Sequence, residues 1–415
     1  MASRLAARAF ARRGGAWWRP RRGLASYDAS PRTYGEAPSS GTPEAFAASS
    51  VAQRVVLPDV CDHLRAHGYA VVDGALDSVF LANGSVASVL REEILSLADP
   101  LPGASSGARS SAMRPNATVL VGGDGATTTR LEKANIFEAE AHALAPERLA
   151  TVPTLRAVAE DRSMLTLLNV MLPASDPTAA LHFQAVKAQI NAGDGACFPM
   201  HFDSDATLDA RKITALTYLN PDWTEGDGGE LVLYPFPAAP VKIAPLAGRV
   251  VLFSAVDTLH RVLPSAKRRV CFTTWFFAKR ARSEGGKGPV PVPDGGDAAR
   301  KVARAAAAAA AGEEAARGRV EGEDALAAEE LRDLFGPTLR RHLAKVVHAA
   351  EWASSIEDAH PDTPARAEAL ETHWREVGVI ARALMRRAPR GMEAAAKGAG
   401  EIQRLGVNTD TWFDL

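Results

Sequence analysis

Short segments of alternating apolar and polar residues dominate the chain between about residues 180 and 280. Seven of them are rich in β-branched and aromatic residues and are separated by turn residues: FQAVKAQI, FPMHFD, KITALTYL, GELVLYP, VKIAPL, GRVVLFS and RRVCFTTWFF. Strands at this spacing predict a double sheet or a barrel.

The last of these segments alternates strictly. Its two faces are Arg269, Cys271, Thr273 and Trp275 on one side, and Val270, Phe272, Thr274 and Phe276 on the other. Because successive side chains of a strand point to opposite faces, we expect one face to look into a lumen and the other to pack.

Helical patterns precede this β-rich region. The segment LPDVCDHLRAHGYAVVDGAL predicts a helix with Val60, Leu64 and His67 on one face, followed by the strand 69–72. Further helices are expected over residues 85–98 and within LRAVAEDRSMLTLLNVML. The Gly/Ser/Ala-rich residues 102–125 predict an irregular loop, a candidate for a flexible lid on the substrate side.

Beyond GGKGPVPVPDGG the strand formers give way to Ala, Glu, Arg and Leu, which predict helices. We therefore expect a main domain over residues 53–282, a Gly/Pro linker over 283–296 and a helical extension over 297–415. Amphipathic segments such as LRRHLAKVVHAAEW predict that this extension packs on the domain, binds a partner or self-associates.

Composition narrows the class of protein. The 415 residues hold 48 Lys plus Arg against 49 Asp plus Glu, which gives no bias toward nucleic acid. Three scattered cysteines form neither a disulfide framework nor a paired zinc motif, and no run of about 18 apolar residues predicts a membrane span. The length allows an enzyme, and the cysteine usage fits a reducing compartment.

The N-terminus has a different composition from the rest. Residues 1–27 hold seven arginines and no acidic residue precedes Asp28, which is typical of an organelle transit peptide. Arginine outweighs serine, so we expect a mitochondrial location, with plastid as the alternative, or cytoplasm if the segment is a basic tail. Residues 28–52 are expected to be a linker.

A candidate metal site begins in FPMHFD. His201 and Asp203 lie two apart in a strand and project to the same side. A facial site of two histidines and one carboxylate, typical of non-haem Fe(II) enzymes, needs a second histidine from another strand, and His260 follows the segment GRVVLFS. Asp205 shares the strand face and competes with Asp203, which we favour because neighbouring same-side positions converge more easily on one ion.

Arg269 opens the last strand, and Thr273 follows on the same face. A 2-oxo acid that chelates iron retains a distal carboxylate, for which a buried guanidinium is the natural partner and a threonine hydroxyl a further donor. Zinc also binds two histidines and an aspartate, but a hydrolytic zinc site needs no such carboxylate anchor. Each feature alone has an ordinary structural explanation, and their combination favours Fe(II).

Four motifs follow one another along the chain: HFD at 201–203, ITALTYLNPDW, DGGELVLYPFP and HRVLPSAKRRVCFTTWFF. Over roughly residues 186–279 the chain resembles the Fe(II)/2-oxoglutarate dioxygenase domain of the prolyl 4-hydroxylase superfamily, and it is especially similar to the hypoxia-factor type prolyl hydroxylases. The resemblance implies an α+β fold: a double-stranded β-helix, or jelly roll, with flanking helices, to which this chain adds the C-terminal helical extension.

The resemblance also implies roles. His201, Asp203 and His260 would bind Fe(2+), and Arg269 would anchor 2-oxoglutarate with help from Tyr218 and Thr273. The cosubstrates would be 2-oxoglutarate and O2, L-ascorbate would keep the iron ferrous, and the substrate would be a residue of a peptide or protein, proline first.

One departure concerns the substrate. Such hydroxylases commonly carry a tyrosine ten residues before the first iron-binding histidine, where this chain has Asn191. We expect Asn191 or Gln189 to hydrogen-bond the cosubstrate instead. Two alternatives remain open: a hydroxylase of a free amino acid or small metabolite, and a noncatalytic jelly-roll binding module.

Overall fold

The computed structural model describes residues 41–99, 111–121, 128–174, 179–204, 210–278, 322–336 and 339–407. The expected transit peptide (1–27), most of the linker 28–52 and the whole linker 283–296 lie outside the described residues, as does Asp205. No helix in the described part of the chain is long and apolar enough to cross a membrane.

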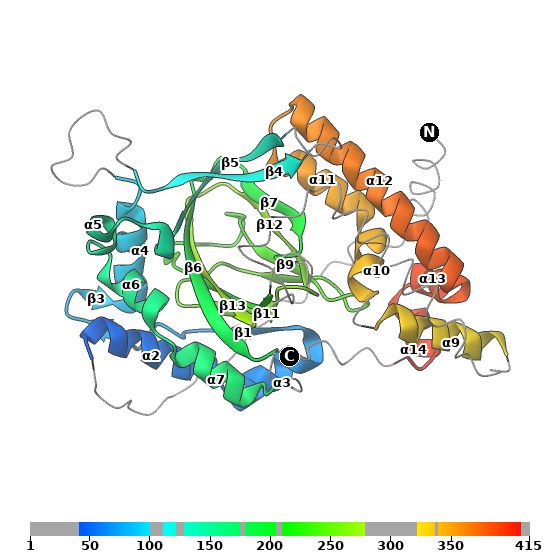
Figure 1. The fold of residues 1–415 in the computed structure, drawn as a ribbon, viewed down its shortest axis with the longest axis horizontal. Helices are drawn as coiled ribbons and strands as arrows, with labels where there is room; N and C mark the ends of the chain where they lie inside the picture. Colours follow the sequence, from blue (N-terminus) through cyan, green and yellow to red (C-terminus); the bar gives the residue numbers. More distant parts are fainter. Residues whose placement is uncertain are drawn as a thin grey trace, which may run out of the picture.

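Two antiparallel sheets form the centre of the molecule (Figure 1). The larger sheet has seven strands in the order β1 (Tyr69–Val72), β11 (Val250–Ser254), β8 (Arg211–Tyr218), β13 (Arg269–Ala278), β6 (Leu181–Asn191), β5 (Thr128–Glu140) and β4 (Arg114–Val121). The smaller sheet has the order β10 (Val241–Ile243), β9 (Leu231–Tyr234), β12 (Leu259–Ser265) and β7 (Ala196–His201). The expected α+β jelly-roll core is confirmed.

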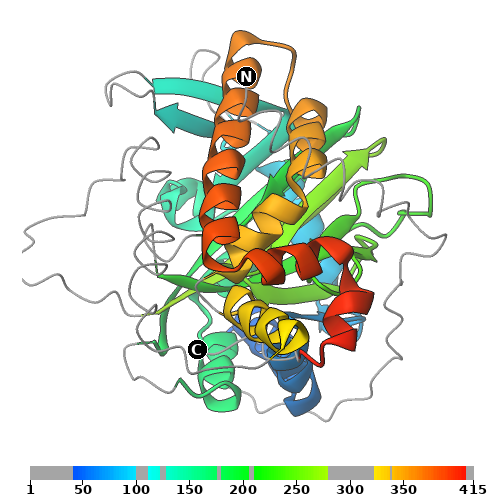
Figure 2. The same ribbon diagram turned by 90° about the vertical axis from the view of Figure 1, so that its right-hand side faces the viewer.

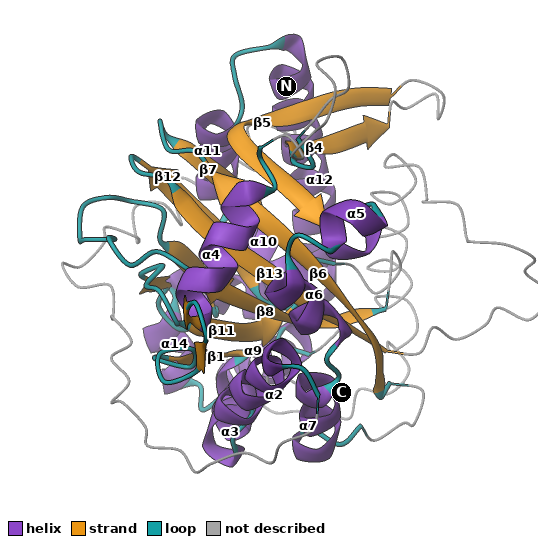
Figure 3. Cartoon of the chain, turned by 90° about the vertical axis from the view of Figure 1, so that its left-hand side faces the viewer, coloured by secondary structure: helices purple, strands orange, loops and turns teal. Residues whose placement is uncertain are grey.

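Helices cover the outer face of the larger sheet (Figure 3). They are α2 (Pro43–Val55), α3 (Pro58–His67), α4 (Val86–Ser96), the single turns η1 (Ala141–Ala143) and α5 (Pro146–Leu149), α6 (Pro153–Glu160) and α7 (Ser163–Met171); a small hairpin, β2 (Phe80–Leu81) and β3 (Gly84–Ser85), precedes α4. Proline starts α3, and Gly68, at φ 75°, ends it in a left-handed conformation that suits glycine. The expected helix and strand around HGYAVV are confirmed.

Strand β13 divides its side chains between two environments, as its alternation predicts. Val270, Phe272 and Phe276 join the core under the helices. Arg269 and Thr273 face the space between the sheets. The larger sheet therefore has one packed face and one face that can carry chemistry.

The C-terminal helices form a layer beside the smaller sheet (Figure 2). They are α9 (Glu323–Leu334), α10 (Arg340–Val347), α11 (Ala349–Ala359), α12 (Pro364–Arg387), α13 (Pro389–Lys397) and α14 (Ala399–Arg404). They share a core of their own, which includes Leu331, Leu343, Leu384 and Met392. Helix α11 packs on β7, where Trp352 lies against Phe202 with ring centroids 6.0 Å apart.

Four expectations need correction. Residues 43–52, expected in the linker 28–52, form most of α2, because Ala47 and Val55 of that helix pack in the core of the main domain. Residues 114–121, placed in an irregular loop, form β4, which pairs with β5. The helix expected within LRAVAEDRSMLTLLNVML is two helices, α6 and α7, separated at Asp161 and Arg162. Strand β12, which contains His260, is not among the seven strands that the sequence predicts.

Candidate active site

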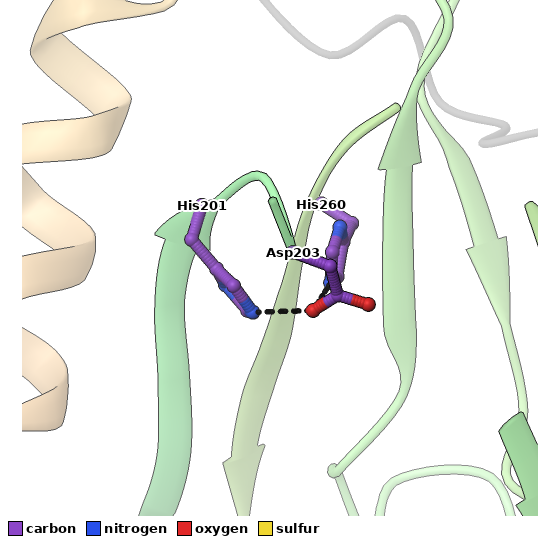
Figure 4. A group of neighbouring side chains, drawn as sticks. All are labelled: His201, Asp203 and His260. Carbon is purple, nitrogen blue, oxygen red and sulfur yellow. Dashed lines mark ion pairs between the residues drawn. The ribbon is translucent and has the colours of Figure 1, made fainter. Parts of the chain in front are cut away.

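Two strands of the smaller sheet and the turn after β7 bring three candidate ligands together (Figure 4). His201 ends β7 and pairs directly with His260 of β12, so their rings lie side by side with centroids 4.3 Å apart. Asp203 follows His201 by two residues, and its Oδ1 lies 3.5 Å from His201 Nε2 and 3.7 Å from His260 Nε2. One ligand atom from each residue lies within 4.8 Å of the others, so the group can hold a metal ion.

Backbone carbonyls orient both imidazoles. His201 Nδ1 lies 2.8 Å from the carbonyl oxygen of Pro199, and His260 Nδ1 lies 3.0 Å from that of Thr258. Since a carbonyl oxygen only accepts, each Nδ1–H donates and each Nε2 keeps its lone pair. Outer hydrogen bonds of this kind fix the tautomer of metal-binding histidines.

The carboxylate of Asp203 is held through its other oxygen. Thr214 Oγ1 donates to Oδ2 at 2.5 Å, and Trp275 Nε1 donates to the same atom at 3.2 Å. Oδ1 is thereby left facing the two histidines. Asp203 is presented as a ligand through one oxygen atom.

Burial and charge set the protonation of the site. Burial, with a contribution from His201, lowers the pKa of His260 to about 4, so its imidazole is neutral at physiological pH. Burial opposes the charged form of Asp203, but the two neighbouring histidines and the hydrogen bond from Thr214 hold the pKa of that carboxyl far below its usual range. The site therefore offers the carboxylate of Asp203 and, from His260, a neutral nitrogen.

These residues line an open cavity with an empty volume of about 450 Å³ between the sheets. Its lining residues are Lys187, Gln189, Phe198, His201, Asp203, Thr214, Leu216, Leu231, Phe253, His260, Val262, Arg269, Thr273 and Trp275. The His-Asp-His group and Arg269 thus share one chamber.

Arg269 is a buried cation in this chamber, only 2% exposed. Its Nε and Nη2, and the hydroxyl of the fully buried Tyr218, are without a hydrogen-bond partner. The guanidinium lies 4.9 Å from the centre of the Tyr218 ring, and burial raises the pKa of Tyr218 to about 12, so the hydroxyl keeps its proton. Unpaired buried donors are costly unless an anion satisfies them, and a carboxylate fits this set.

The structure does not bring Asn191 to the cavity. Its side-chain amide donates to the carbonyl of Ala196 at 2.9 Å and accepts from the N–H of Gly193 at 3.0 Å. Both ends of the side chain are therefore used in closing the turn between β6 and β7, which corrects the expectation that Asn191 binds the cosubstrate. Gln189, the alternative, does line the cavity.

Sequence reasoning also missed three residues of the cavity wall. Lys187 lies 3.0 Å from Glu138 of β5, and its ammonium is 4.6 Å from the centre of the Trp275 ring. Thr214 and Trp275 hold Asp203. The alternation of KITALTYL places Thr214 on the face of Leu216 and Tyr218, a signal that could have found it.

A jelly roll with a His-Asp-His group and a buried arginine in the chamber between its sheets is the arrangement typical of non-haem, metal-dependent oxygenases. The sequence profile of the 2OG-Fe(II) oxygenase superfamily matches residues 184–277. A crystal structure of a prolyl 4-hydroxylase from Phytophthora capsici is similar over 90% of this chain and 97% of that one, with 27% identity and a TM-score of 0.52.

Two further solved structures match less of the chain. A prolyl hydroxylase from Trichoplax adhaerens, in complex with a hypoxia inducible factor peptide, has 20% identity over 58% of this chain and 94% of that one, with a TM-score of 0.42. A Pseudomonas putida prolyl-4-hydroxylase has 21% identity over 53% of this chain and 98% of that one, with a TM-score of 0.38. Residues 184–277 thus carry a 2OG-Fe(II) oxygenase domain, which makes the protein an oxidoreductase of the dioxygenase class. This match confirms the resemblance to the superfamily seen in the motifs.

Proposed function

We propose that the protein hydroxylates a residue of a peptide or protein, with proline as the first candidate, using Fe(II), 2-oxoglutarate and O2. The observation that carries the proposal is the His-Asp-His group in one cavity with the unpaired donors of Arg269. The similarity to the Phytophthora capsici prolyl 4-hydroxylase over nearly the whole chain supports proline.

The donor set suits Fe(II) and its cosubstrate. His201, Asp203 and His260 would hold the ion on one side, and the rest of its coordination sphere would stay open. Arg269 would bind the distal carboxylate of 2-oxoglutarate, with Tyr218 and Thr273 donating further hydrogen bonds. When bound, iron and 2-oxoglutarate together supply the oxidising chemistry: 2-oxoglutarate is converted to succinate and CO2, one atom of O2 enters succinate, and the other becomes the hydroxyl oxygen of the product.

The protein's own residues do the positioning. Thr214 and Trp275 keep Asp203 turned toward the histidines, and the carbonyls beside each histidine hold Nδ1, which leaves Nε2 facing the site. Preorganised ligands of this kind cost no rearrangement when the ion binds. The apolar side chains of Leu231, Phe253 and Val262 line the same chamber.

A competition between substrate classes tests this proposal. The purified protein, with Fe(II), 2-oxoglutarate and ascorbate, is given proline-containing peptides, matched peptides with alanine in place of proline, and free amino acids. We expect succinate release and a mass gain of one oxygen atom only with the proline peptides. Turnover of free amino acids alone would favour the small-metabolite alternative.

We also propose L-ascorbate as the reductant and the mitochondrion as the location. The arginine-rich, acid-free residues 1–27 support the location. Import of a reporter fused to these residues into isolated mitochondria, compared with plastids, tests it. Repeating the turnover assay without ascorbate tests the reductant: activity that decays over successive turnovers is expected.

A further inference from the structure

Helix α11 lies against β7, the strand that ends in His201 (Figure 1). Because β7 is the last strand in the order of the smaller sheet, N–H groups on its outer edge need partners from elsewhere. The Met200 N–H donates to the Ser355 hydroxyl at 2.8 Å, and that hydroxyl donates to the Trp352 carbonyl at 2.6 Å. Ser355 has no exposed surface.

The same helix contacts the neighbours of both histidines. Phe202, on the other side of His201 from Met200, packs on Trp352. Arg261, next to His260, forms an ion pair with Asp358 at 2.9 Å. Residues that flank two candidate ligands on two different strands are thus held by one element.

The far end of α11 is fixed to the larger sheet. His360 directly follows the helix, and its Nδ1 lies 2.9 Å from the carbonyl oxygen of Glu132 in β5. Helix α11 therefore spans from the smaller sheet to the larger one. A support anchored at both ends resists movement of the strand that it covers.

We propose that α11 is the outer support of the metal site and that Ser355 is a positioning residue for His201, acting through the Met200 N–H. The proposal rests on the proposed function, in which His201 binds the metal. Without the Ser355 hydroxyl, the buried Met200 N–H loses its partner, and the end of β7 shifts to find another. That shift moves His201 Nε2 away from Asp203 Oδ1.

The test measures metal binding rather than turnover. Co(II), a coloured substitute for Fe(II), is titrated into wild type and Ser355→Ala without oxygen, and its dissociation constant is read from the absorption spectrum. We expect Ser355→Ala to raise that constant about tenfold, the lower end of the effect of removing outer partners of metal ligands.

Two controls separate positioning from general destabilisation. Ser354→Ala makes the same change at an exposed neighbour on α11 and should leave the constant within about twofold of wild type. Ile380→Val trims a residue of α12 that is 3% exposed and belongs to the core of the C-terminal helices. It should lower Tm, as core trimming does, without changing the constant.

The outcomes are distinct. An unchanged constant in Ser355→Ala, or an equal rise in Ile380→Val, overturns the positioning role and leaves the proposed function standing. A wild-type protein that takes up no Co(II) or Fe(II) overturns the proposed function and, with it, this proposal.

Discussion

At the scale of single residues, the site combines groups that the sequence shows with groups that only the fold reveals. The sequence alone pointed to four of these residues, because few residue types can bind iron or anchor a carboxylate: His201, Asp203, His260 and Arg269. Thr214 was not selected, although the alternation of its strand places it on the face of Leu216 and Tyr218, since a threonine in a strand has many ordinary uses. Asn191 was misjudged because its distance along the chain from His201 says nothing of the turn that its amide closes.

Removal of Arg269 should weaken 2-oxoglutarate binding strongly. Each hydrogen bond from a charged donor contributes about 1.5–3 kcal/mol, so losing two predicts a dissociation constant for 2-oxoglutarate raised by about a hundredfold or more in Arg269→Ala. Calorimetric titration of the Mn(II)-loaded protein without oxygen measures it. The neighbouring Arg268 is exposed, so Arg268→Ala is the matched control. Equal affinities in wild type and Arg269→Ala would contradict the anchor.

A buried histidine outside the site predicts a pH dependence of stability. Burial, aided by Lys345, lowers the pKa of His373 to about 4 from an unfolded value near 6.5. Between these values the unfolded chain binds more protons than the folded one, so the free energy of unfolding falls as pH decreases from about 6.5 toward 4, by at most about 3 kcal/mol from this residue. Urea unfolding should show a shallower pH slope for His373→Gln; an unchanged slope would contradict it.

At the scale of elements, the sequence predicted those strands whose alternation is strong. The segments that form β6, β8 and β13 are rich in β-branched and aromatic residues, and successive side chains divide clearly between the two faces of each strand. Strand β12, LHRVLPS, was missed because it contains a proline and two basic residues, and burial between β9 and β7 overrides this weak propensity. Strand β5 was not predicted either, because its segment RLEKANIFEAE is rich in charged residues, and pairing with β4 and β6 decides its state.

The DGG turn before β9 provides a test at this scale. Gly228 has φ 75°, and a Cβ there would meet the Pro264 carbonyl oxygen at 2.0 Å, so Gly228→Ala forces the turn away from the end of β12. Gly226 has φ 98° with open space around it, so Gly226→Ala carries only the backbone cost, about 1–2 kcal/mol. We expect the Gly228 variant to be the less stable of the two by differential scanning calorimetry. Equal values of Tm would contradict the close approach.

At the scale of the whole molecule, the C-terminal helices complete the outer side of the smaller sheet. Tyr234 of β9 donates its hydroxyl to Glu351 at 2.5 Å, and Met200, Val232 and Leu259 form one apolar cluster with Ala344. Composition alone predicted a helical extension, but not which face of the domain it would cover, because amphipathic helices can pack on many apolar surfaces.

Truncation after residue 282 should therefore destabilise the rest of the chain. Each large apolar side chain that becomes exposed costs about 1.5–3 kcal/mol, so the free energy of unfolding should fall by several kcal/mol. Urea unfolding measures this, and sedimentation of both forms tests self-association through these helices. A truncated chain with unchanged stability and sedimentation would show that the layer neither supports the domain nor joins copies.

The central claim is that the cavity holds iron and 2-oxoglutarate together. Fe(II) and then 2-oxoglutarate are added to the protein without oxygen, and the metal-to-ligand charge-transfer band is recorded for wild type and His260→Ala. We expect a band in the wild type that requires both additions and is lost in the variant. A wild type without the band, or a variant with the same band, would contradict it.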